Sequence, residues 1–460
     1  MYNIKKAKPH RFTTDMTDGN PTGLIIRFMI PMVIGNVFQQ LYNLVDTVIV
    51  GKAIDADALA AVGATGSLNF LFFSLCNGLA NGIGISVSHA FGAGDKETVR
   101  KTIANAFYIM TVAAVMMGGL GILLARPVLT LLKTPENIID DSVLYMQIVS
   151  AGVIAVSMYN CISAILRGLG DSKTPLYFLV VSSVINVCLD LFFIINLHWG
   201  VAGAAIATII AQASAAVGSL IYSIKTNPEF RIERNEWKPD TYIIHKSCML
   251  GLPLAGQSSM IALSCVILQG VVNPFGSVVC AAFTATGRVE QLIHQPFNSL
   301  GMALSTYTGQ NIGANKPDRV DKGLRQSMII MLILCAIIIP IFQLFSPSIM
   351  GVFVKQEEAE VIAVGAQALR LTSWFYIPLG MIYVCRGLLN GAGDAVYSFM
   401  NGVYEMIGRT LFPKPLTMIP HVGVWGIWWG TVLTWTMTGI YGFVRYKRGK
   451  WRVKTIERNR

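Results

Sequence analysis

Residues 60–66 read AAVGATG and residues 281–287 read AAFTATG, so the second half of the chain repeats a stretch of the first after an interval of 221 residues. Three further pairs of segments match at nearly the same interval: Gly92-Ala93 with Gly313-Ala314, Arg167–Leu169 with Arg386–Leu388, and spaced residues from His198 to Thr208 with those from His421 to Thr431. Self-similarity at a fixed interval indicates that one structural unit occurs twice. The chain is therefore expected to consist of two similar halves in tandem.

Both halves contain apolar runs of membrane-spanning length. Hydrophobic residues make up 53% of the chain and charged residues 13%, against roughly 25% charged residues in soluble domains. Runs of about 20 apolar residues are long enough to cross a hydrocarbon core of about 30 Å. Twelve such runs occur, six in each half, centred near residues 38, 74, 114, 154, 186, 213, 260, 293, 335, 373, 404 and 435. Because backbone groups inside a bilayer must be satisfied within the protein, each run is predicted to be a helix.

These patterns predict an all-α membrane protein with twelve transmembrane helices. The helices are expected to form two six-helix bundles related by a pseudo-two-fold axis along the membrane normal. We expect an N-lobe at residues 1–225, a cytoplasmic linker at residues 226–246 and a C-lobe at residues 247–460. The linker contains Asn227-Pro228, a turn signal, and the C-lobe ends in a basic tail.

Basic residues lie mostly on one side of the predicted spans. If the N-terminus is cytoplasmic, the internal loops and tails hold 28 of the 36 Lys and Arg residues, and the external loops hold five. This asymmetry predicts a multi-pass protein with both termini in the cytoplasm. The tail from Arg445 to Arg460 carries eight of the basic residues. We interpret it as a flank that contacts anionic lipid rather than as a nucleic-acid site.

The motifs of several other functions are missing from the sequence. The polar first twenty residues do not resemble a signal peptide. No GxxxxGK[ST] phosphate loop occurs, so an ATP-driven pump would need its motor on another chain. The eight cysteines show no CxxC pairing, which disfavours a metal site and indicates core packing for nearly all of them. We expect no enzyme activity and no cofactor.

Ionisable residues within the spans are the strongest functional signal, because each costs about 2.5–3.5 kcal/mol to place in a bilayer. The four acids in this position are Asp46, Asp190, Glu290 and Glu405. Glu405 has Arg409 four residues further along, and Glu290 has Arg288 close in sequence, so these two are interpreted as structural ion pairs or polar lining. Asp46 and Asp190 have no basic neighbour on their own helices and are the functional candidates.

The depths of these two acids agree. At about 1.5 Å per residue, Asp46 lies about 28 Å along the first predicted helix and Asp190 about 22 Å along the fifth. Asn186 lies one turn from Asp190, and Thr208 lies about 10 Å into the sixth helix, which runs the opposite way. These four side chains are predicted to meet in the outer half of the N-lobe. Carboxylate, amide and hydroxyl oxygens suit a hard monovalent cation, and two close carboxylates can also hold a proton.

Several stretches resemble the multidrug and toxic compound extrusion (MATE) family, bacterial type, over about residues 20 to 445. Pro31–Gly51 resembles the first helix of that family. Three shorter motifs also resemble it: GLGDSKTP at 168–175, TGQNIGA at 308–314 and RGLLNGAGD at 386–394. The resemblance implies a V-shaped pair of bundles in a bacterial cytoplasmic membrane. It also implies export of amphipathic, often cationic compounds in exchange for Na+ or H+.

Carried over residue by residue, the N-lobe cation site of the family falls on Asp46, Asn186, Asp190 and Thr208. Pro31 matches a first-helix proline whose bending has been proposed to link cation binding to substrate release. The NorM-like branch has acidic coupling residues in its C-lobe, whereas residues 250–271 contain no acid and Arg370 is the one charged residue around 366–383. The chain is therefore closer to the DinF-like branch. A metal is expected nowhere beyond a possible Na+ at the N-lobe site.

Contacts with the exported compound are expected from polar and aromatic side chains that can face a cleft: Gln39, Asn43, Asn69, Gln257, Gln269, Gln291, His294 and Tyr383. Gln39, Asn43 and Asp46 form a polar stripe on one helix face, and polar side chains avoid lipid. We expect the partners to be a small amphipathic molecule and membrane lipid, and the protein to function as a monomer.

Two other classes of protein are weighed against an exporter. A lipid-linked oligosaccharide flippase of the same superfamily would require a cleft lined with several basic residues, and the spans offer Arg288, Arg370 and Arg409. A channel or receptor would leave the duplicated loops and the paired acids without a role. Drug export driven by an ion gradient therefore remains the preferred hypothesis.

Overall fold

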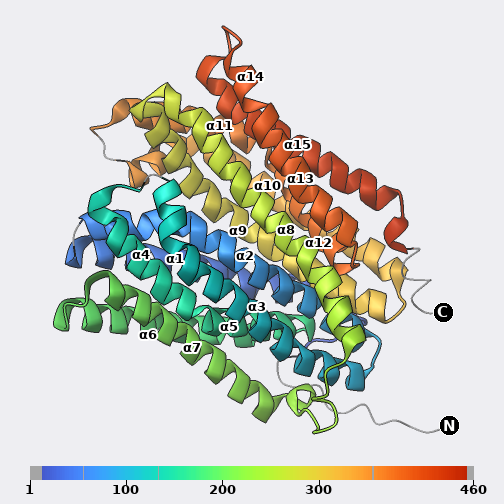
Figure 1. The fold of residues 1–460 in the computed structure, drawn as a ribbon. Helices are drawn as coiled ribbons and strands as arrows, with labels where there is room; N and C mark the ends of the chain where they lie inside the picture. The colour runs from blue at the N-terminus through green and yellow to red at the C-terminus, as the bar shows by residue number, and fades with distance from the viewer. Residues whose placement is uncertain (1–12, 55, 133, 355–356, 453–460) are drawn as a thin grey trace, which may run out of the picture. The chain divides into compact units, whose positions relative to one another are not determined.

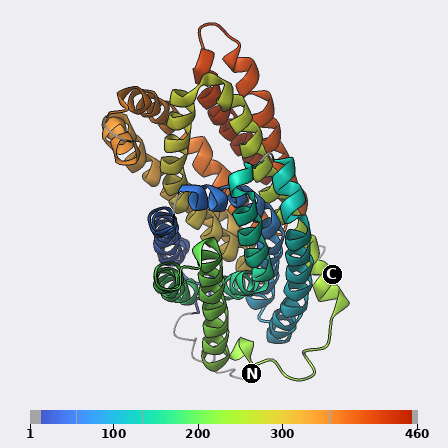
Figure 2. The ribbon, with the colours of Figure 1, turned by 60° about the vertical axis from the view of Figure 1, so that its left-hand side comes forward.

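The computed structural model describes residues 13–54, 56–132, 134–354 and 357–452. All regular secondary structure in these ranges is helical (Figures 1 and 2). Part of the basic pattern used to predict orientation lies outside the described residues: Lys5, Lys6, Lys8, Arg11, Lys133, Lys355 and the tail beyond Arg452.

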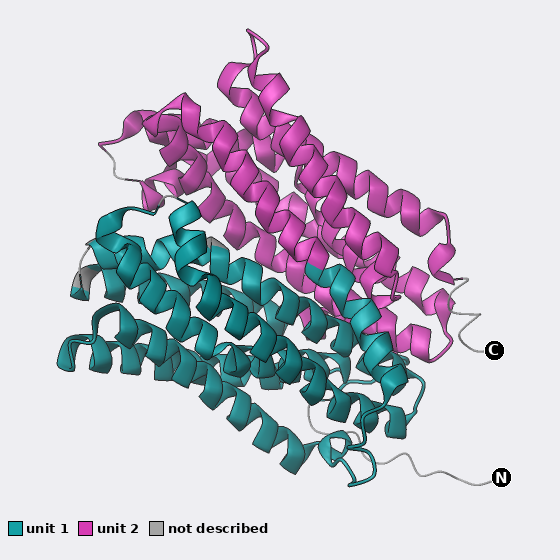
Figure 3. Ribbon diagram, viewed as in Figure 1, with its two compact units in different colours: residues 1–18, 30–255 teal, residues 19–29, 256–460 magenta. Residues whose placement is uncertain are grey.

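Contacts divide the chain into two compact units, coloured separately in Figure 3. Unit 1 comprises residues 1–18 and 30–255, and unit 2 comprises residues 19–29 and 256–460. Two helices are shared, because the division falls within α1, Pro21–Ala53, and within α8, Thr241–Val272. The expected lobes at 1–225 and 247–460 and their linker remain a prediction about which parts move together.

The other helices of unit 1 are α2 (Ala56–Gly92), α3 (Lys96–Leu131), α4 (Glu136–Ala151), α5 (Val153–Gly168), α6 (Lys173–Asp190), a π-helix, η1 (Leu191–Asn196), α7 (Gly200–Thr226) and a short 3₁₀ helix, η2 (Pro228–Phe230). Helix α2 packs against α3, α4 and α5, and α6 packs against α7. The core of this unit contains Ile83, Ile103 and Ile165. These side chains come from α2, α3 and α5, so three separate apolar runs bury one another.

Unit 2 contains η3 (Asn273–Phe275), α9 (Ser277–Gly313), α10 (Pro317–Phe353), α11 (Ala359–Ser373), α12 (Tyr376–Gly391), α13 (Ala395–Leu411), α14 (Pro413–Thr417), η4 (Gly423–Trp425) and α15 (Gly426–Lys447). Helix α12 packs against α9, α10 and α15, and α13 packs against α15. This arrangement repeats that of unit 1, in which α5 packs against α2, α3 and α7.

Within the described residues, seven helices are long and apolar enough to span a membrane, or up to nine if each of two bent pairs forms one span. The bent pairs are α4 with α5, at 48°, and α11 with α12, at 56°. Three helices, α9, α13 and α15, complete a set of twelve. Helix α9 contains Arg288 and Glu290, and α13 has 17 residues, which explains why composition and length alone do not select them.

Matched turns begin equivalent helices in the two units. Gly170 and Gly393 have positive φ angles of 85° and 78°, a backbone conformation that glycine adopts without strain. Each is followed by an aspartate that caps the next helix: Asp171 accepts hydrogen bonds from the amides of Lys173 and Thr174, and Asp394 accepts one from the Tyr397 amide. The GLGD and GAGD motifs are therefore helix stops followed by helix starts.

Close backbone contact also requires glycine at one repeated position. A Cβ atom on Gly168 would lie 2.5 Å from the carbonyl oxygen of Gly84, and one on Gly387 would lie 2.1 Å from that of Gly301. Both glycines belong to the repeated Arg-Gly-Leu triplets. Each triplet thus lets one helix cross another in its own unit at backbone distance.

Candidate functional site

The structure brings together the four residues predicted to bind a cation. Asp46 comes from α1, Asn186 and Asp190 from α6, and Thr208 from α7, all within unit 1. The side chains of Asn186 and Asp190 are buried, and those of Asp46 and Thr208 are half-buried. We call Asp46 and Asp190 the acid pair. Their role in binding a cation remains a prediction.

Hydrogen bonds connect the members of this cluster. The two carboxyl groups of the acid pair lie close enough to interact. Oriented to satisfy its neighbours, the Asn186 amide donates to Asp190 Oδ2 at 3.0 Å and accepts from the Thr208 amide nitrogen at 3.2 Å. One oxygen of each acid, Oδ1, is buried without a hydrogen-bond partner among the described residues. The cluster therefore holds two unused acceptor atoms directed into protein.

Two tyrosines that sequence reasoning missed belong to the same cluster. Tyr42 lies near Thr208, and Tyr42 and Tyr145 are both close enough to the acid pair to interact with it electrostatically. Tyr42 lies one turn before Asp46 on α1, so its spacing was a usable signal. Tyr145 is on α4, and nothing in its sequence context indicated this position.

Asp190 ends α6 and directly precedes the π-helix η1. A single π-helical turn within a longer helix is rare and is often found at functional sites. Here the wider turn follows the residue that carries the buried acid.

In unit 2, the predicted ion pair between Glu405 and Arg409 is present, at 3.5 Å. Glu405 also forms a closer ion pair with Arg386 of α12, and Arg386 donates to Asn401 at 2.7 Å. Sequence reasoning missed Arg386 because the repeated triplet was used as a marker of duplication rather than as a source of charge. A carboxylate paired with two guanidinium groups is typical of a structural ion-pair network.

Glu290 does not form the expected pair with Arg288. Its carboxyl group lies near the Thr372 side chain on α11, and Arg288 is exposed. The two residues are two positions apart on α9, so their side chains leave the helix in different directions.

The residues predicted to line a cleft are distributed over both units. In unit 1, Gln39 and Asn43 are exposed and Asn69 is half-buried. In unit 2, Gln257 is buried and donates to Asn401 at 2.7 Å, Gln269 donates to Asn273, and Gln291 is exposed. His294 packs edge-on against Tyr383, with ring centroids 5.9 Å apart. Their contact with a transported compound remains a prediction.

Pro31 is buried within α1, one residue after the position where the two compact units divide. A proline in a helix interior removes one backbone hydrogen bond and favours a bend. A role in gating remains a prediction.

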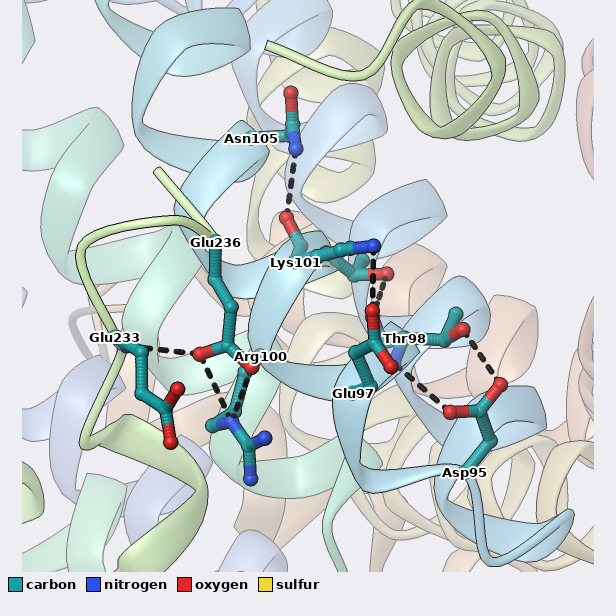
Figure 4. A network of polar contacts seen from close by, with 9 residues as sticks. Asp95, Glu97, Thr98, Arg100, Lys101, Asn105, Glu233 and Glu236 are labelled. Carbon is teal, nitrogen blue, oxygen red and sulfur yellow. Dashed lines mark hydrogen bonds and ion pairs between the residues drawn. The ribbon is translucent and has the colours of Figure 1, made fainter. Parts of the chain in front are cut away.

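The segment after α7 is fixed to α3 within unit 1 (Figure 4). Arg100 bonds to Glu236 at 2.7 and 2.9 Å, and the Glu233 amide donates to the same carboxylate at 2.8 Å. Burial opposes ionisation of Glu236, but these hydrogen bonds outweigh it and hold the pKa of Glu236 below its usual range. Trp237 also packs against Phe107. We call residues 227–240 the strap.

No group of three or more His, Cys, Asp or Glu side chains suited to a metal ion occurs among the described residues. The eight cysteines are free thiols, and two of them, Cys188 and Cys265, are exposed rather than packed in the core. These two are exceptions to the core packing that was predicted for nearly all of the cysteines.

Comparison with known proteins gives a consistent result. The MatE family model matches residues 31–192 and 253–408. The chain is 30% identical to the probable multidrug resistance protein YpnP of Bacillus subtilis, with 96% of this chain and 98% of YpnP covered. It is 27% identical to the probable multidrug resistance protein YoeA of the same organism, over 94% of both chains.

A solved structure shares the fold. It is that of a MOP superfamily transporter from Pyrococcus furiosus, with a TM-score of 0.89, 23% identity and coverage of 97% of this chain and 99% of that one. Twelve helices in two similar sets, a family match over both halves and two full-length relatives lead to one conclusion: this chain belongs to the MatE family, the multi-pass membrane transporters of multidrug and toxic compound extrusion, and is not an enzyme.

Proposed function

We propose that this protein exports amphipathic small molecules, cationic ones among them, in exchange for protons bound at the acid pair. The placement of the Asp46 and Asp190 carboxyl groups in one cluster with Asn186 carries this proposal. Two carboxylates in a site of low dielectric repel each other, and one proton removes that repulsion. The pair can therefore bind a proton with no other ion.

The acid pair suits coupling because its charge state changes its own packing. With one proton bound, Asp46 and Asp190 attract each other across α1 and α6. When the proton leaves, two negative charges face each other in a site of low dielectric and repel. Proton binding therefore favours one arrangement of the two helices over another. A ligand shifts a conformational equilibrium only through such a difference in affinity.

Na+ is the second candidate ion. Two carboxylates, the Asn186 carbonyl and the Thr208 hydroxyl form an all-oxygen donor set that suits a hard cation. The ion would then replace the proton between the acids. The same residues serve both ions, so transport measurements must separate them.

The relatives support drugs as the exported class, since YpnP and YoeA are both named probable multidrug resistance proteins. The excess of basic residues on one side supports a bacterial cytoplasmic membrane location with both termini in the cytoplasm. Each unit contains its own polar cluster, which supports function as a monomer.

Transport by the purified protein in liposomes tests the proposal. Liposomes that contain ethidium are given a pH gradient without Na+, and a second set is given a Na+ gradient at constant pH. We expect the pH gradient to drive ethidium movement, and Asp46→Asn and Asp190→Asn each to reduce it to the level of protein-free liposomes. Both changes are nearly isosteric and remove a buried charge, so the fold should persist.

Glu290→Gln is the matched control, because Glu290 is an intramembrane acid of unit 2 without a second carboxylate partner. It should retain most of the transport. Movement driven by the Na+ gradient alone would identify Na+ as the coupling ion. Full transport by Asp190→Asn together with loss in Glu290→Gln would transfer coupling to unit 2 and refute the assignment.

A further inference from the structure

One side of helix α9 in unit 2 carries a row of polar side chains. They recur at intervals of three or four residues, so they lie on one face of the helix: Thr284, Arg288, Gln291 and Gln295. The first three are exposed, and Gln295 is half-buried. We call these four residues the α9 stripe. It is an exposed polar face within a predicted membrane span.

The opposite side of α9 is apolar and buried. It contributes Val289, Ile293 and Phe297, and the helix packs against α10, α11 and α12 of the same unit. Helix α9 therefore has one apolar side that packs on protein and one polar side that is exposed. A helix with this pattern normally turns its polar side to water.

Contacts with other helices do not satisfy the stripe. Thr284 donates to the Cys280 carbonyl at 2.9 Å, a bond within α9 itself. The exposed Arg288 side chain forms no hydrogen bond or ion pair with another described residue. A Cβ atom added to Gly287, the preceding residue, would meet no described atom within 4 Å. The N–H donors of this guanidinium group are therefore available to a molecule from outside the protein.

The depth of Arg288 argues against exposure to lipid. Helix α9 begins at Ser277, so Arg288 lies about 16 Å along it at about 1.5 Å per residue. This is near the middle of a hydrocarbon layer about 30 Å thick. An arginine at that depth is costly in lipid, and the neighbouring amide of Gln291 adds to the cost. Both observations indicate that water, rather than lipid, covers the stripe.

The other repeat does not carry this charge. At the interval of 221 residues, the positions of Arg288 and Gln291 are occupied by Ser67 and Phe70 of α2. The repeated backbone is therefore built without an arginine at this place. A role that belongs to unit 2 alone accounts for Arg288 better than a role in folding.

We propose that the α9 stripe lines the path of the transported compound, and that Arg288 selects molecules that carry an anionic group, zwitterions among them. This inference rests on the proposed function and narrows its substrate class. A carboxylate, sulfonate or phosphate accepts two N–H groups from the planar guanidinium fork. The same fixed charge disfavours molecules whose only charge is positive. The phosphate of an anionic lipid offers the same chemistry, and the experiment separates the two sources.

Charged thiol reagents test whether water and a positive charge adjoin the stripe. Gln291→Cys is made in a parent protein that carries Cys188→Ser and Cys265→Ser, because these two native thiols are exposed; the parent itself is the blank. The purified full-length protein in phosphatidylcholine nanodiscs is treated with a sulfonate and with a trimethylammonium methanethiosulfonate. We expect both to react. Relative to a small thiol in solution, the sulfonate should be favoured, and Arg288→Gln should lower this preference about two- to fivefold, the strength of an ion pair in contact with water.

Two controls accompany this measurement. Ile337→Cys replaces a side chain of α10 that is 56% exposed among other apolar ones, and it should react at least about tenfold more slowly, since a thiol in lipid does not ionise. Arg370→Gln removes an exposed arginine of unit 2 outside the stripe and should leave the preference unchanged. Equally slow reaction at positions 291 and 337, or a preference that persists in Arg288→Gln, would overturn the proposal.

Tetramethylrhodamine and its methyl ester test the selectivity directly, because the parent dye is a zwitterion with a carboxylate and the ester is a cation. Each is used to protect Gln291→Cys from the neutral reagent methyl methanethiosulfonate. We expect the zwitterion to protect at a concentration at least about fivefold lower than the ester, as one charge-assisted contact allows. Arg288→Gln should make the two dyes equal. Equal protection with Arg288 present, or protection by neither dye, would contradict the assigned selectivity.

Nanodiscs that contain phosphatidylglycerol identify the source of the anion. Unchanged protection by the zwitterion supports a site for transported compounds. Protection by this lipid without dye, lost in Arg288→Gln, would assign the site to lipid phosphate and overturn the proposal. Asp190→Asn separates the inference from proton coupling. That variant should keep both the reagent preference and the dye preference even though it no longer transports, so either idea can fail without the other.

Discussion

Asn186 in α6 and Arg409 in α13 occupy the same position in the two repeats. Each lies fifteen residues after the aspartate, Asp171 or Asp394, that caps its helix. In unit 1 this position carries an amide beside two carboxyl groups. In unit 2 it carries a guanidinium beside one carboxylate. The repeat therefore keeps its backbone while the charge at this position differs between its two copies.

Under the proposed function, the two units therefore differ in the kind of positive charge that faces their buried carboxylates: a dissociable ion in unit 1 and arginine side chains in unit 2. The acid pair of unit 1 then binds a proton or Na+ that exchanges with solvent. In unit 2 the positive charges of Arg386 and Arg409 are covalently attached to the chain. Because a gradient can perform work only on an exchangeable ion, we propose that coupling belongs to unit 1.

A second pair of equivalent positions carries opposite charges in the two units. Arg100 of α3 and Asp321 of α10 match at the repeat interval of 221 residues. Arg100 pairs with Glu236 of the strap, whereas Asp321 pairs with Arg452 after α15 and accepts from the Tyr446 hydroxyl at 2.7 Å. Each repeat thus fixes the segment that follows its last helix, with opposite signs.

The largest effect is expected when the unit 1 position receives the type of residue found at the equivalent position of unit 2. Asn186→Arg places a fixed positive charge beside the acid pair, as Arg409 is placed in unit 2. We expect pH-driven ethidium transport to fall to the protein-free level. The cost of the larger side chain is about 1–3 kcal/mol, so thermal unfolding of the purified protein is measured in parallel. Asn186→Gln, which enlarges the side chain without charge, is the control. If Asn186→Arg transports normally, the contrast between the units has no role in coupling.

Arg386→Gln should have the largest effect on stability. It leaves Glu405 with only the long contact to Arg409, and loss of one partner of a buried ion pair costs about 3–5 kcal/mol. Unfolding in detergent, followed by tryptophan fluorescence, measures this loss. Asp190→Asn should be neutral or stabilising in the same assay, because it removes repulsion. Equal destabilisation by the two variants would mean that Asp190 is structural as well.

Two equivalent threonines, Thr208 in unit 1 and Thr431 in unit 2, provide a test in which an effect of intermediate size on transport is expected. The hydroxyls of Thr208 and Thr431 each donate to a carbonyl of their own helix, Ala204 and Ile427, but only the Thr208 hydroxyl also lies 3.5 Å from the Asn186 amide group among the described contacts. Thr208→Val therefore removes a polar oxygen beside Asn186, whereas Thr431→Val removes one that serves its own helix alone. We expect Thr208→Val to slow pH-driven transport severalfold and Thr431→Val to leave the rate unchanged. Similar rates for the two variants would show that Thr208 does not support the acid pair.

The smallest expected effect concerns the strap. The pKa of Glu236 is held below its usual range in the folded protein, so its stabilising contribution is present above the unfolded pKa of about 4.3 and is lost as the pH falls through the folded value. The hydrogen-exchange protection of residues 230–240, corrected for the intrinsic exchange rate at each pH, should therefore fall below about pH 4. Glu236→Gln should be less protected at neutral pH and lose this dependence. A loss of protection in acid that persists in Glu236→Gln would assign it to another group.

The meeting of Asp46, Asn186, Asp190 and Thr208 could be predicted because a helix advances by a fixed distance per residue and the bilayer sets a common frame. Residues at the same depth on different spans can therefore be predicted to lie close together. Tyr145 could not be found in this way, since which face of α4 meets α1 is decided by packing. The bends between α4 and α5 and between α11 and α12 were also missed, because the apolar runs continue across both breaks.

Arg386 shows a second limit of the sequence. Its partner Glu405 lies 19 residues away on another helix, and an ion pair between helices has no fixed spacing. The pair of Glu405 with Arg409 was found because it obeys the spacing of one helix. Contacts set by helix geometry were therefore predictable, and contacts set by the packing of two helices were not.

The shared helices have a consequence for the folding of the protein. Residues 19–29, at the start of α1, belong with the second half of the chain, and residues 241–255, at the start of α8, belong with the first. Each repeat thus lends the beginning of its first helix to the other. A single repeat taken alone would therefore lack one helix segment of its compact unit, so we expect the two repeats to fold together rather than as separate fragments.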